Sequence, residues 1–334
     1  MLKMNGLSRP SRHSTLYVKL VLTALFWGGT FVAGRIVSQQ VSPFCAALLR
    51  FIVASFFLTG FVLKHHGRFP RLERDQVVPV ILLGLSGVFA YNAFFFSGLR
   101  TIAAGRASLI IASNPAFIAL FAALFFHERL SAQRLAGILL SMLGAITVIS
   151  RGNPLEVFDG ALGMGELYIC GCVASWVCYS LIGKVAMQRL SPLVTVTYAC
   201  AIGAGFLLFP ALIELSANGV TLYPAPAWLG ILYLGFFGSA LGFIWYYEGI
   251  KEIGPSRAGV FINIVPVSSI VLAYVFLNEA LDMSLAAGAL MVITGVFLTN
   301  RNRTAKNLPR PLPAPHLGAK ELAAGSPSGV KPEL

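Results

Sequence analysis

Charge is scarce in this sequence. Only 11% of the 334 residues are charged, 57% are hydrophobic, and Asp and Glu together number 13. A soluble domain carries roughly 25% charged residues, and no polar surface could cover so apolar a core, so we expect lipid to be the solvent. The formal net charge of +12 does not indicate a nucleic-acid partner, because most Lys and Arg fall in short connections and tails.

Catalytic and metal-binding motifs are also missing. The sequence has no HExxH, no GxSxG and no mid-span Asp pair, so proteolysis within the membrane lacks its bases. The five cysteines lie in apolar segments without a CxxC pair, which is typical of buried free thiols. We therefore expect no enzyme, no cofactor and no metal. All histidines lie in tails, loops or at a span end: His13, His65, His66, His127 and His316.

Ten apolar runs fill the chain, each close to the roughly 20 residues that cross about 30 Å of hydrocarbon. They predict an all-α membrane protein with ten transmembrane helices. Basic residues gather at the connections that would face the same side as the N-terminus, so both termini are expected in the cytoplasm. The runs are 17–37, 43–63, 76–96, 102–126, 132–149, 161–185, 192–214, 226–247, 255–277 and 283–299.

The two halves of the chain are related. Three residues recur at one spacing of 151: Arg106, Pro115 and Glu128 match Arg257, Pro266 and Glu279. Each half holds five spans, an odd number, so the second half should enter the membrane upside down. Inverted repeats of this kind form transporters that bind substrate where the halves meet. The expected parts are an N-terminal segment 1–16, repeats 17–150 and 161–299, a loop 151–160 and a disordered tail 300–334.

Proline and asparagine mark the predicted centre. Pro115 and Pro266 each remove a backbone donor, so their helices should kink or break there and act as hinges. Asn114 lies some ~18 Å deep in its span, where its amide could bind a substrate ammonium or carboxylate. Asn92 and Asn263 are further candidates. The alternative for all three is a hydrogen bond that only joins helices.

Aromatic residues supply the other binding candidates. Trp27 and Trp176 occupy equivalent mid-span positions, although tryptophan in membranes usually lies at the interfaces. Tyr179 shares a helix face with Trp176, and Phe95 and Tyr246 lie on the third and eighth spans. We expect these side chains to line a cavity, with ordinary packing or lipid contact as the alternative.

Arg50 is the unusual charge, seven residues into the second span, where a charge is costly unless it is paired or hydrated. Its equivalent in the second half is Ala199. The first hypothesis is a structural or gating ion pair, with Glu279 as a possible partner, and an anion site is the sharper alternative. Glu128 and Glu279 end their helices at opposite faces and are expected to pair with nearby cations.

Several motifs together resemble a known family. The segment WGGTFVAGR, the pattern P-x6-R-F from Pro43 to Phe51, and the Asn-Pro helix that ends in Glu are similar to EamA-type members of the drug/metabolite transporter superfamily, over residues 17–299. The resemblance implies a carrier of small metabolites, often an exporter of amino acids, in the bacterial inner membrane.

Other functions stay open at this point. A carrier of phosphorylated metabolites should have several cations at its cavity, and a channel would not need broken helices. No acid lies mid-span, so facilitated diffusion or exchange fits slightly better than proton antiport, with Glu166 at the rim as the candidate for coupling. The expected partners are a small-molecule substrate and the bilayer. Glycines seven residues apart predict close packing within the bundle or across a homodimer: Gly137, Gly144, Gly288 and Gly295.

Overall fold

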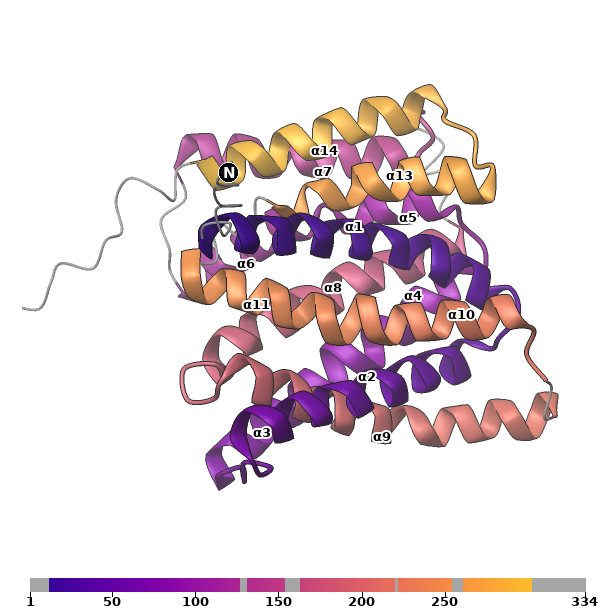
Figure 1. Cartoon of the computed structure of the whole chain (residues 1–334). Coiled ribbons are helices and arrows are strands. Elements are labelled where there is room, and N and C mark those ends of the chain that lie inside the picture. Colours follow the sequence, from indigo (N-terminus) through magenta and orange to yellow (C-terminus); the bar gives the residue numbers. More distant parts are fainter. Residues whose placement is uncertain (1–11, 127–130, 154–162, 220–221, 254–260, 302–334) are drawn as a thin grey trace, which may run out of the picture. The chain divides into compact units, whose positions relative to one another are not determined.

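The computed structural model describes residues 12–126, 131–153, 163–219, 222–253 and 261–301 (Figure 1). Within these ranges the protein is helical and contains no strand. These described ranges contain eight helices long and apolar enough to cross a membrane, and two shorter apolar helices, Ile264–Leu277 and Met283–Thr299. Glu128, Arg257, most of the N-terminal segment, most of the loop between the halves and nearly all of the tail lie outside the described residues.

The helices of the first half follow the predicted apolar runs. They are α1 (Arg12–Ser38), α2 (Pro43–His66), α3 (Arg74–Leu83), η1 (Gly84–Ala90), α4 (Tyr91–Leu99), α5 (Ala104–Ile111), α6 (Asn114–Phe126) and α7 (Ala132–Ile149). Those of the second half are α8 (Met164–Ala186), α9 (Pro192–Asn218), α10 (Ala225–Tyr233), η3 (Leu234–Leu241), α11 (Gly242–Ile253), α13 (Ile264–Leu277) and α14 (Met283–Arg301).

Two spans contain a π-helical segment at matching positions. η1 interrupts the span Arg74–Leu99, and η3 interrupts the span Ala225–Gly249. π-Helical turns are rare and occur often at functional sites. The glycine pairs Gly84/Gly235 and Gly87/Gly238 within them are each 151 residues apart.

The glycines in these segments permit close helix contact. A Cβ atom at Gly84 would lie 3.1 Å from the Ala199 carbonyl oxygen, and one at Gly235 would lie 2.8 Å from that of Arg50. Both spans therefore press a glycine against the backbone of a neighbour, η1 against α9 and η3 against α2.

The fourth and ninth spans are interrupted next to their prolines. Helix α5 ends at Ile111 and α6 begins at Asn114, so Pro115 lies in the first turn of α6. In the second half Asn263 precedes α13, whose third residue is Pro266. Proline is tolerated in a first turn because the N–H groups there have no partner within the helix. A hinge motion at either break stays a prediction.

Helices α7 and α14 pack side by side through the four predicted glycines (Figure 1). A Cβ atom at Gly137 would lie 2.6 Å from the Gly295 carbonyl oxygen, and one at Gly288 would lie 3.0 Å from that of Gly144. The two helices therefore run antiparallel, and these glycines are used within the chain. A homodimer stays a prediction.

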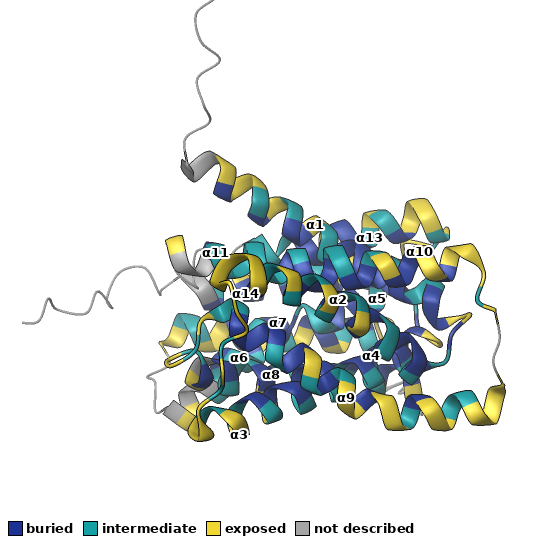
Figure 2. Ribbon diagram, turned by 60° about the horizontal axis from the view of Figure 1, so that its bottom comes forward, coloured by how far each residue is buried: buried dark blue, intermediate teal, exposed yellow. Residues whose placement is uncertain are grey.

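Helix α1 lies between α13 and the α10–α11 span (Figure 1). It runs antiparallel to that span, because Gly238 packs on Thr30 and Gly249 packs on Leu20. Helix α8 also runs antiparallel to η1 and α4, since Gly87 meets Tyr179 and Gly98 meets Ile169. Large apolar side chains such as Phe209, which is 72% exposed, face outward, as a lipid-facing surface requires. Exposed positions occur on outer helices, for example along α9 (Figure 2).

Candidate functional site

Arg50 lies inside the helix bundle, with 7% of its surface exposed. Its Nε donates a hydrogen bond to Ser239 Oγ at 3.0 Å, and its Nη1 donates to Asn92 Oδ1 at 2.9 Å. The guanidinium carbon lies 5.4 Å from the centre of the Phe51 ring and 5.9 Å from that of Phe95. Arg50 is therefore held by neutral dipoles and aromatic rings.

This arrangement links the two π-helical segments. Asn92 Nδ2 donates to the Val88 carbonyl of η1 at 2.8 Å, and Ser239 Oγ donates to the Leu234 carbonyl of η3 at 3.0 Å. Carbonyl groups within both segments thus gain side-chain donors. The sequence predicted Asn92 as a substrate ligand, but both ends of its amide are engaged here and it is 1% exposed.

The predicted ion pair between Arg50 and Glu279 is not formed. Glu279 instead accepts hydrogen bonds from the backbone N–H groups of Ala104, at 2.7 Å, and Gly105, at 3.0 Å. A carboxylate at the start of a helix satisfies backbone donors and complements the helix dipole, so Glu279 caps α5. Among the described residues, no carboxylate pairs with Arg50.

Aromatic side chains from α1, α4, α8 and α11 meet in a second group, which we call the aromatic cluster. The Phe243 ring lies between Trp27, at 5.7 Å, and Trp176, at 6.3 Å. The Trp27 indole N–H donates to the Gly238 carbonyl of η3 at 2.9 Å. The cluster consists of Trp27, Tyr91, Trp176, Tyr179, Phe243 and Tyr246.

The cluster joins four of the predicted binding residues. Tyr246 contacts Trp27 at 5.2 Å, and Trp176 contacts Tyr179 at 5.2 Å. Most of its rings are half-buried rather than sealed. Phe95 is different, because it is 1% exposed and packs between Tyr91 and Arg50. Phe95 therefore packs behind Tyr91 and Arg50 and does not line the aromatic cluster.

Sequence reasoning missed Phe243 and Ser239. A usable signal existed for Phe243, which lies 151 residues after Asn92 and so occupies the same place in the other half. Ser239 follows the repeated Gly238, but nothing in the sequence indicates that it meets Arg50, 189 residues away.

The predicted asparagines at the helix breaks differ in their surroundings. Asn114 is 6% exposed, and its Oδ1 has no hydrogen-bond partner among the described residues. Asn263 is half-buried and forms no side-chain cap on α13. A buried amide oxygen without a partner is costly to the fold, so Asn114 is the better candidate for a group that a ligand completes.

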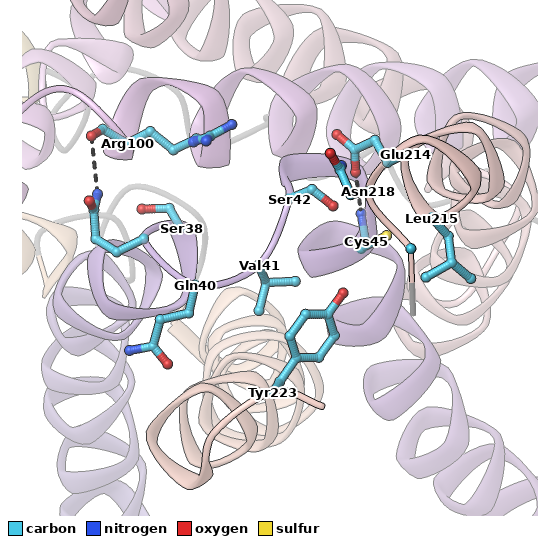
Figure 3. Close-up of a pocket in the computed structure, with 12 residues that line it drawn as sticks. Ser38, Gln40, Val41, Ser42, Cys45, Arg100, Glu214, Leu215, Asn218 and Tyr223 are labelled. Atoms are coloured by element: carbon cyan, nitrogen blue, oxygen red, sulfur yellow. Dashed lines mark hydrogen bonds between the residues drawn. The ribbon is translucent and has the colours of Figure 1, made fainter. Parts of the chain in front are cut away.

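A separate polar pocket of about 250 Å³ lies where α1 ends and α2 begins (Figure 3). Glu214 Oε2 accepts hydrogen bonds there from the backbone N–H groups of Phe44, at 2.9 Å, and Cys45, at 3.0 Å, and so caps α2. Trp27 is 11 residues from Ser38 along α1, about 16 Å at about 1.5 Å per residue, so the pocket is distant from the aromatic cluster. Other lining residues are Gln40, Ser42, Arg100, Asn218 and Tyr223.

Acidic residues stay near helix ends. Glu166 is buried in the first turn of α8, and Glu248 pairs with Lys19 at 2.7 Å. The described residues contain no cluster of His, Cys, Asp or Glu that could hold a metal ion.

Comparison with known proteins agrees with this arrangement. An uncharacterised transporter of Bacillus subtilis, YyaM, is 29% identical over 85% of this chain and 93% of its own length. A "Probable terminal-alkyne amino-acid exporter" of Streptantibioticus cattleyicolor is 30% identical over 84% of this chain and 92% of its own. A crystal structure of another protein has the same fold, with a TM-score of 0.61 at 22% identity over 85% of this chain and 98% of that one.

The EamA-like transporter family matches residues 15–150 and 163–301, which together make up most of the chain. These are the two related halves, and they include all the residues of the aromatic cluster and the Arg50 network. The protein is an integral, multi-pass membrane transporter that belongs to the EamA-like transporter family.

Proposed function

We propose that this transporter is an alternating-access exporter of amino acids or related zwitterionic and aromatic compounds. Its ten spans form two inverted halves of five helices, with both termini in the cytoplasm. The aromatic cluster carries this proposal, because Trp27 and Trp176 come from equivalent helices and reach the same ring, Phe243. A substrate bound there touches both halves at once.

The packing of helix pairs supports the inverted arrangement. Helix α1 runs antiparallel to the α10–α11 span, and its equivalent α8 runs antiparallel to α4. Gly84 meets the backbone of Ala199 as Gly235 meets that of Arg50. These contacts of one half thus have counterparts in which the halves exchange roles. Two such states of similar energy are what alternating access requires.

The chemistry of the cluster supports an amphipathic cargo. Aromatic rings supply apolar contact area and attract cations such as a substrate ammonium group. The relative from Streptantibioticus cattleyicolor, named for amino-acid export, is consistent with this class. A phosphorylated cargo fits less well, because Arg50 is the cation that lies deep among the described helices.

Uptake into proteoliposomes tests the proposal. Purified protein would be given a panel of labelled amino acids without an ion gradient, beside the Trp176→Ala variant. We expect saturable, self-competing uptake, with KM raised by about 10-fold in Trp176→Ala, since truncation removes ring contacts worth on the order of 1.5 kcal/mol. The matched control is Phe209→Ala, which removes an outward-facing ring and should leave KM unchanged.

The outcomes separate the proposal from its rivals. Flux that does not saturate indicates a channel and contradicts the proposal. Uptake that begins only under a pH gradient indicates proton coupling and directs attention to Glu166. Equal effects of the two alanine variants would mean that the cluster has no special role in binding.

A further inference from the structure

We propose that Arg50 is the anchor for the carboxylate of the substrate, and that the aromatic cluster beside it receives the apolar body. This inference rests on the proposed function and names the ligand chemistry of the same site. It follows from four observations about Arg50: its charge, its unused donors, its place beside the cluster and its equivalent in the other half.

The charge of Arg50 is not neutralised within the described protein. Hydrogen bonds from Nε and Nη1 go to neutral side chains, and its ring contacts are with Phe51 and Phe95. A buried ion costs several kcal/mol unless an opposite charge and good hydrogen bonds compensate it. The site is therefore incomplete in a way that an anion corrects.

The guanidinium retains donors for that anion. Arginine has five N–H groups, and Nη2, which carries two of them, has no hydrogen bond among the described residues. A Cβ atom at Gly238 would lie 3.8 Å from Nη2 and 2.6 Å from Thr30 Cγ2, so this end of the group lies beside the η3 backbone and Thr30. A carboxylate is the anion that best matches the planar guanidinium fork.

Arg50 also borders the aromatic cluster. Phe95 lies under the guanidinium and stacks on Tyr91 at 5.9 Å, and Tyr91 contacts Trp176 at 5.3 Å. On the other side, Gly238 accepts the hydrogen bond of Trp27. A ligand with a carboxylate at Nη2 would thus place its remaining atoms toward the rings.

Helix packing does not require the arginine side chain. The contact of α2 with Gly235 is made by the backbone oxygen of residue 50, and Ala199 makes the equivalent contact with Gly84. An alanine therefore suffices at this position for the shape of the bundle. The positive charge is present in one half alone, so its role is not part of the packing that the two halves share. Binding of a single substrate is a role of this kind.

A binding experiment tests this inference independently of transport. The probes are L-phenylalanine and phenethylamine, which share a ring and an ammonium group and differ in the carboxylate, and the readout is the dissociation constant for purified full-length protein. For the native protein we expect phenylalanine to bind about 10- to 100-fold more tightly, the usual value of a charged hydrogen bond. In Arg50→Gln, the affinity for phenylalanine should fall to that for phenethylamine, and the affinity for phenethylamine should stay as in the native protein.

Two further variants complete the design. Arg35→Gln is the matched control. Arg35 lies in the last turn of α1 and donates to the backbone oxygen of Leu99 at the end of α4, so loss of its charge should leave both affinities unchanged. Arg50→Lys keeps the charge and should retain part of the preference for phenylalanine, which tests the anchor even if Arg50→Gln does not fold.

Each outcome has one meaning. An Arg50→Gln protein that keeps the preference, or that loses both ligands equally, overturns the carboxylate anchor and leaves the proposed function standing. Weaker binding of phenylalanine alone in Arg50→Lys supports the anchor, whereas an equal loss of both ligands in that variant overturns it. Equal affinities in the native protein would also overturn the anchor. A native protein that binds neither probe contradicts both the anchor and the proposed cargo class.

Discussion

The two halves of this transporter share many described features of backbone but have different chemistry at their centres. The first half has Arg50, Asn92 and Asn114, and the second has Ala199, Phe243 and Val265 at the matching positions. What the halves share is backbone: a π-segment in mid-span, a break beside a proline and glycines at the contacts. What they do not share is the placement of polar residues, since Ser239 and Asn263 of the second half match Val88 and Ala112 of the first.

This contrast separates two requirements of a carrier. Exchange between inward-open and outward-open states requires that the two states have similar free energies, and similar backbones in the two halves favour this. Recognition of one substrate needs one set of polar groups, and a symmetric duplicate would supply a second set that stays buried and unpaired at a cost. The apolar residues Ala199, Phe243 and Val265 at the matching positions avoid that cost.

The largest effect should come from the contact between the halves at α7 and α14. A Cβ atom at Gly295 would lie 2.4 Å from the Ser141 amide nitrogen, so Gly295→Leu must separate the two helices. Overpacking usually costs about 1–3 kcal/mol and more when backbone must move, so we expect loss of monodisperse protein on size exclusion. Gly205→Leu, at a glycine with open space around it, is the control. Normal behaviour of Gly295→Leu would contradict the packing described here.

The two equivalent tryptophans should differ in their importance for stability. Trp27→Phe removes the hydrogen bond to the Gly238 carbonyl and should lower the free energy of unfolding by about 1–3 kcal/mol. The Trp176 indole has no hydrogen bond among the described residues, so Trp176→Phe should cost less than about 1 kcal/mol. Thermal unfolding in detergent compares them, and equal losses would argue against the asymmetry.

Exchange of residues 114 and 265 tests whether Asn114 serves substrate binding or stability. Asn114→Val gives the first half the residue of the second and removes an unpaired buried oxygen, so stability should hold or rise. If Asn114 binds substrate, KM should rise by about 10-fold. The reverse change, Val265→Asn, buries a new amide and should destabilise by about 1–3 kcal/mol. A less stable Asn114→Val with normal KM would make Asn114 a structural residue.

The smallest effect concerns the caps of α7 and α14. Ser131 Oγ accepts from the Arg134 backbone N–H, and Asp282 Oδ1 accepts from that of Leu285 at 2.7 Å. Burial alone would raise the pKa of Asp282, but hydrogen bonds from Ser284 and Leu285 and the charge of Arg106 outweigh it and lower the pKa. The folded state therefore gains stability at neutral pH that is lost as the pH falls through this lowered pKa.

Asp282→Ser, which copies the cap of the first half, should remove that dependence on pH. The difference between native and variant protein should stay under about 1 kcal/mol, because the group is largely exposed. Unfolding measured at neutral and acidic pH would show it. A native protein that becomes relatively more stable in acid would have the opposite sign and would contradict the assignment.

Much of the fold follows from local sequence patterns. Apolar runs predict where helices lie, and the Asn-Pro pair at Asn114 predicts an interruption, because both depend on neighbouring residues alone. The recurrence of Trp27 at Trp176 predicts that both helices contribute to one site. The helix positions, the interruption and the recurrence can all be read from the sequence without the contacts between distant segments.

The polar contacts of the site could not be predicted in the same way. Arg50 meets Ser239 across 189 residues, and Glu279 caps α5 across 175. The sequence does not distinguish one acid near a helix end from another, and Glu279, the possible partner of Arg50, caps α5 instead. The π-segments were also missed, because one extra residue in a turn leaves the apolar composition of a span unchanged.

Counterflow in proteoliposomes shows whether one binding site is exposed alternately to the two sides of the membrane. Vesicles loaded with unlabelled L-phenylalanine would be placed in a trace of the labelled compound, with no ion gradient. A carrier with one site exposed alternately to either side predicts transient accumulation of label above its equilibrium level, because internal substrate drives the exchange. A simple approach to equilibrium, at the same rate in loaded and empty vesicles, would contradict alternating access at the aromatic cluster.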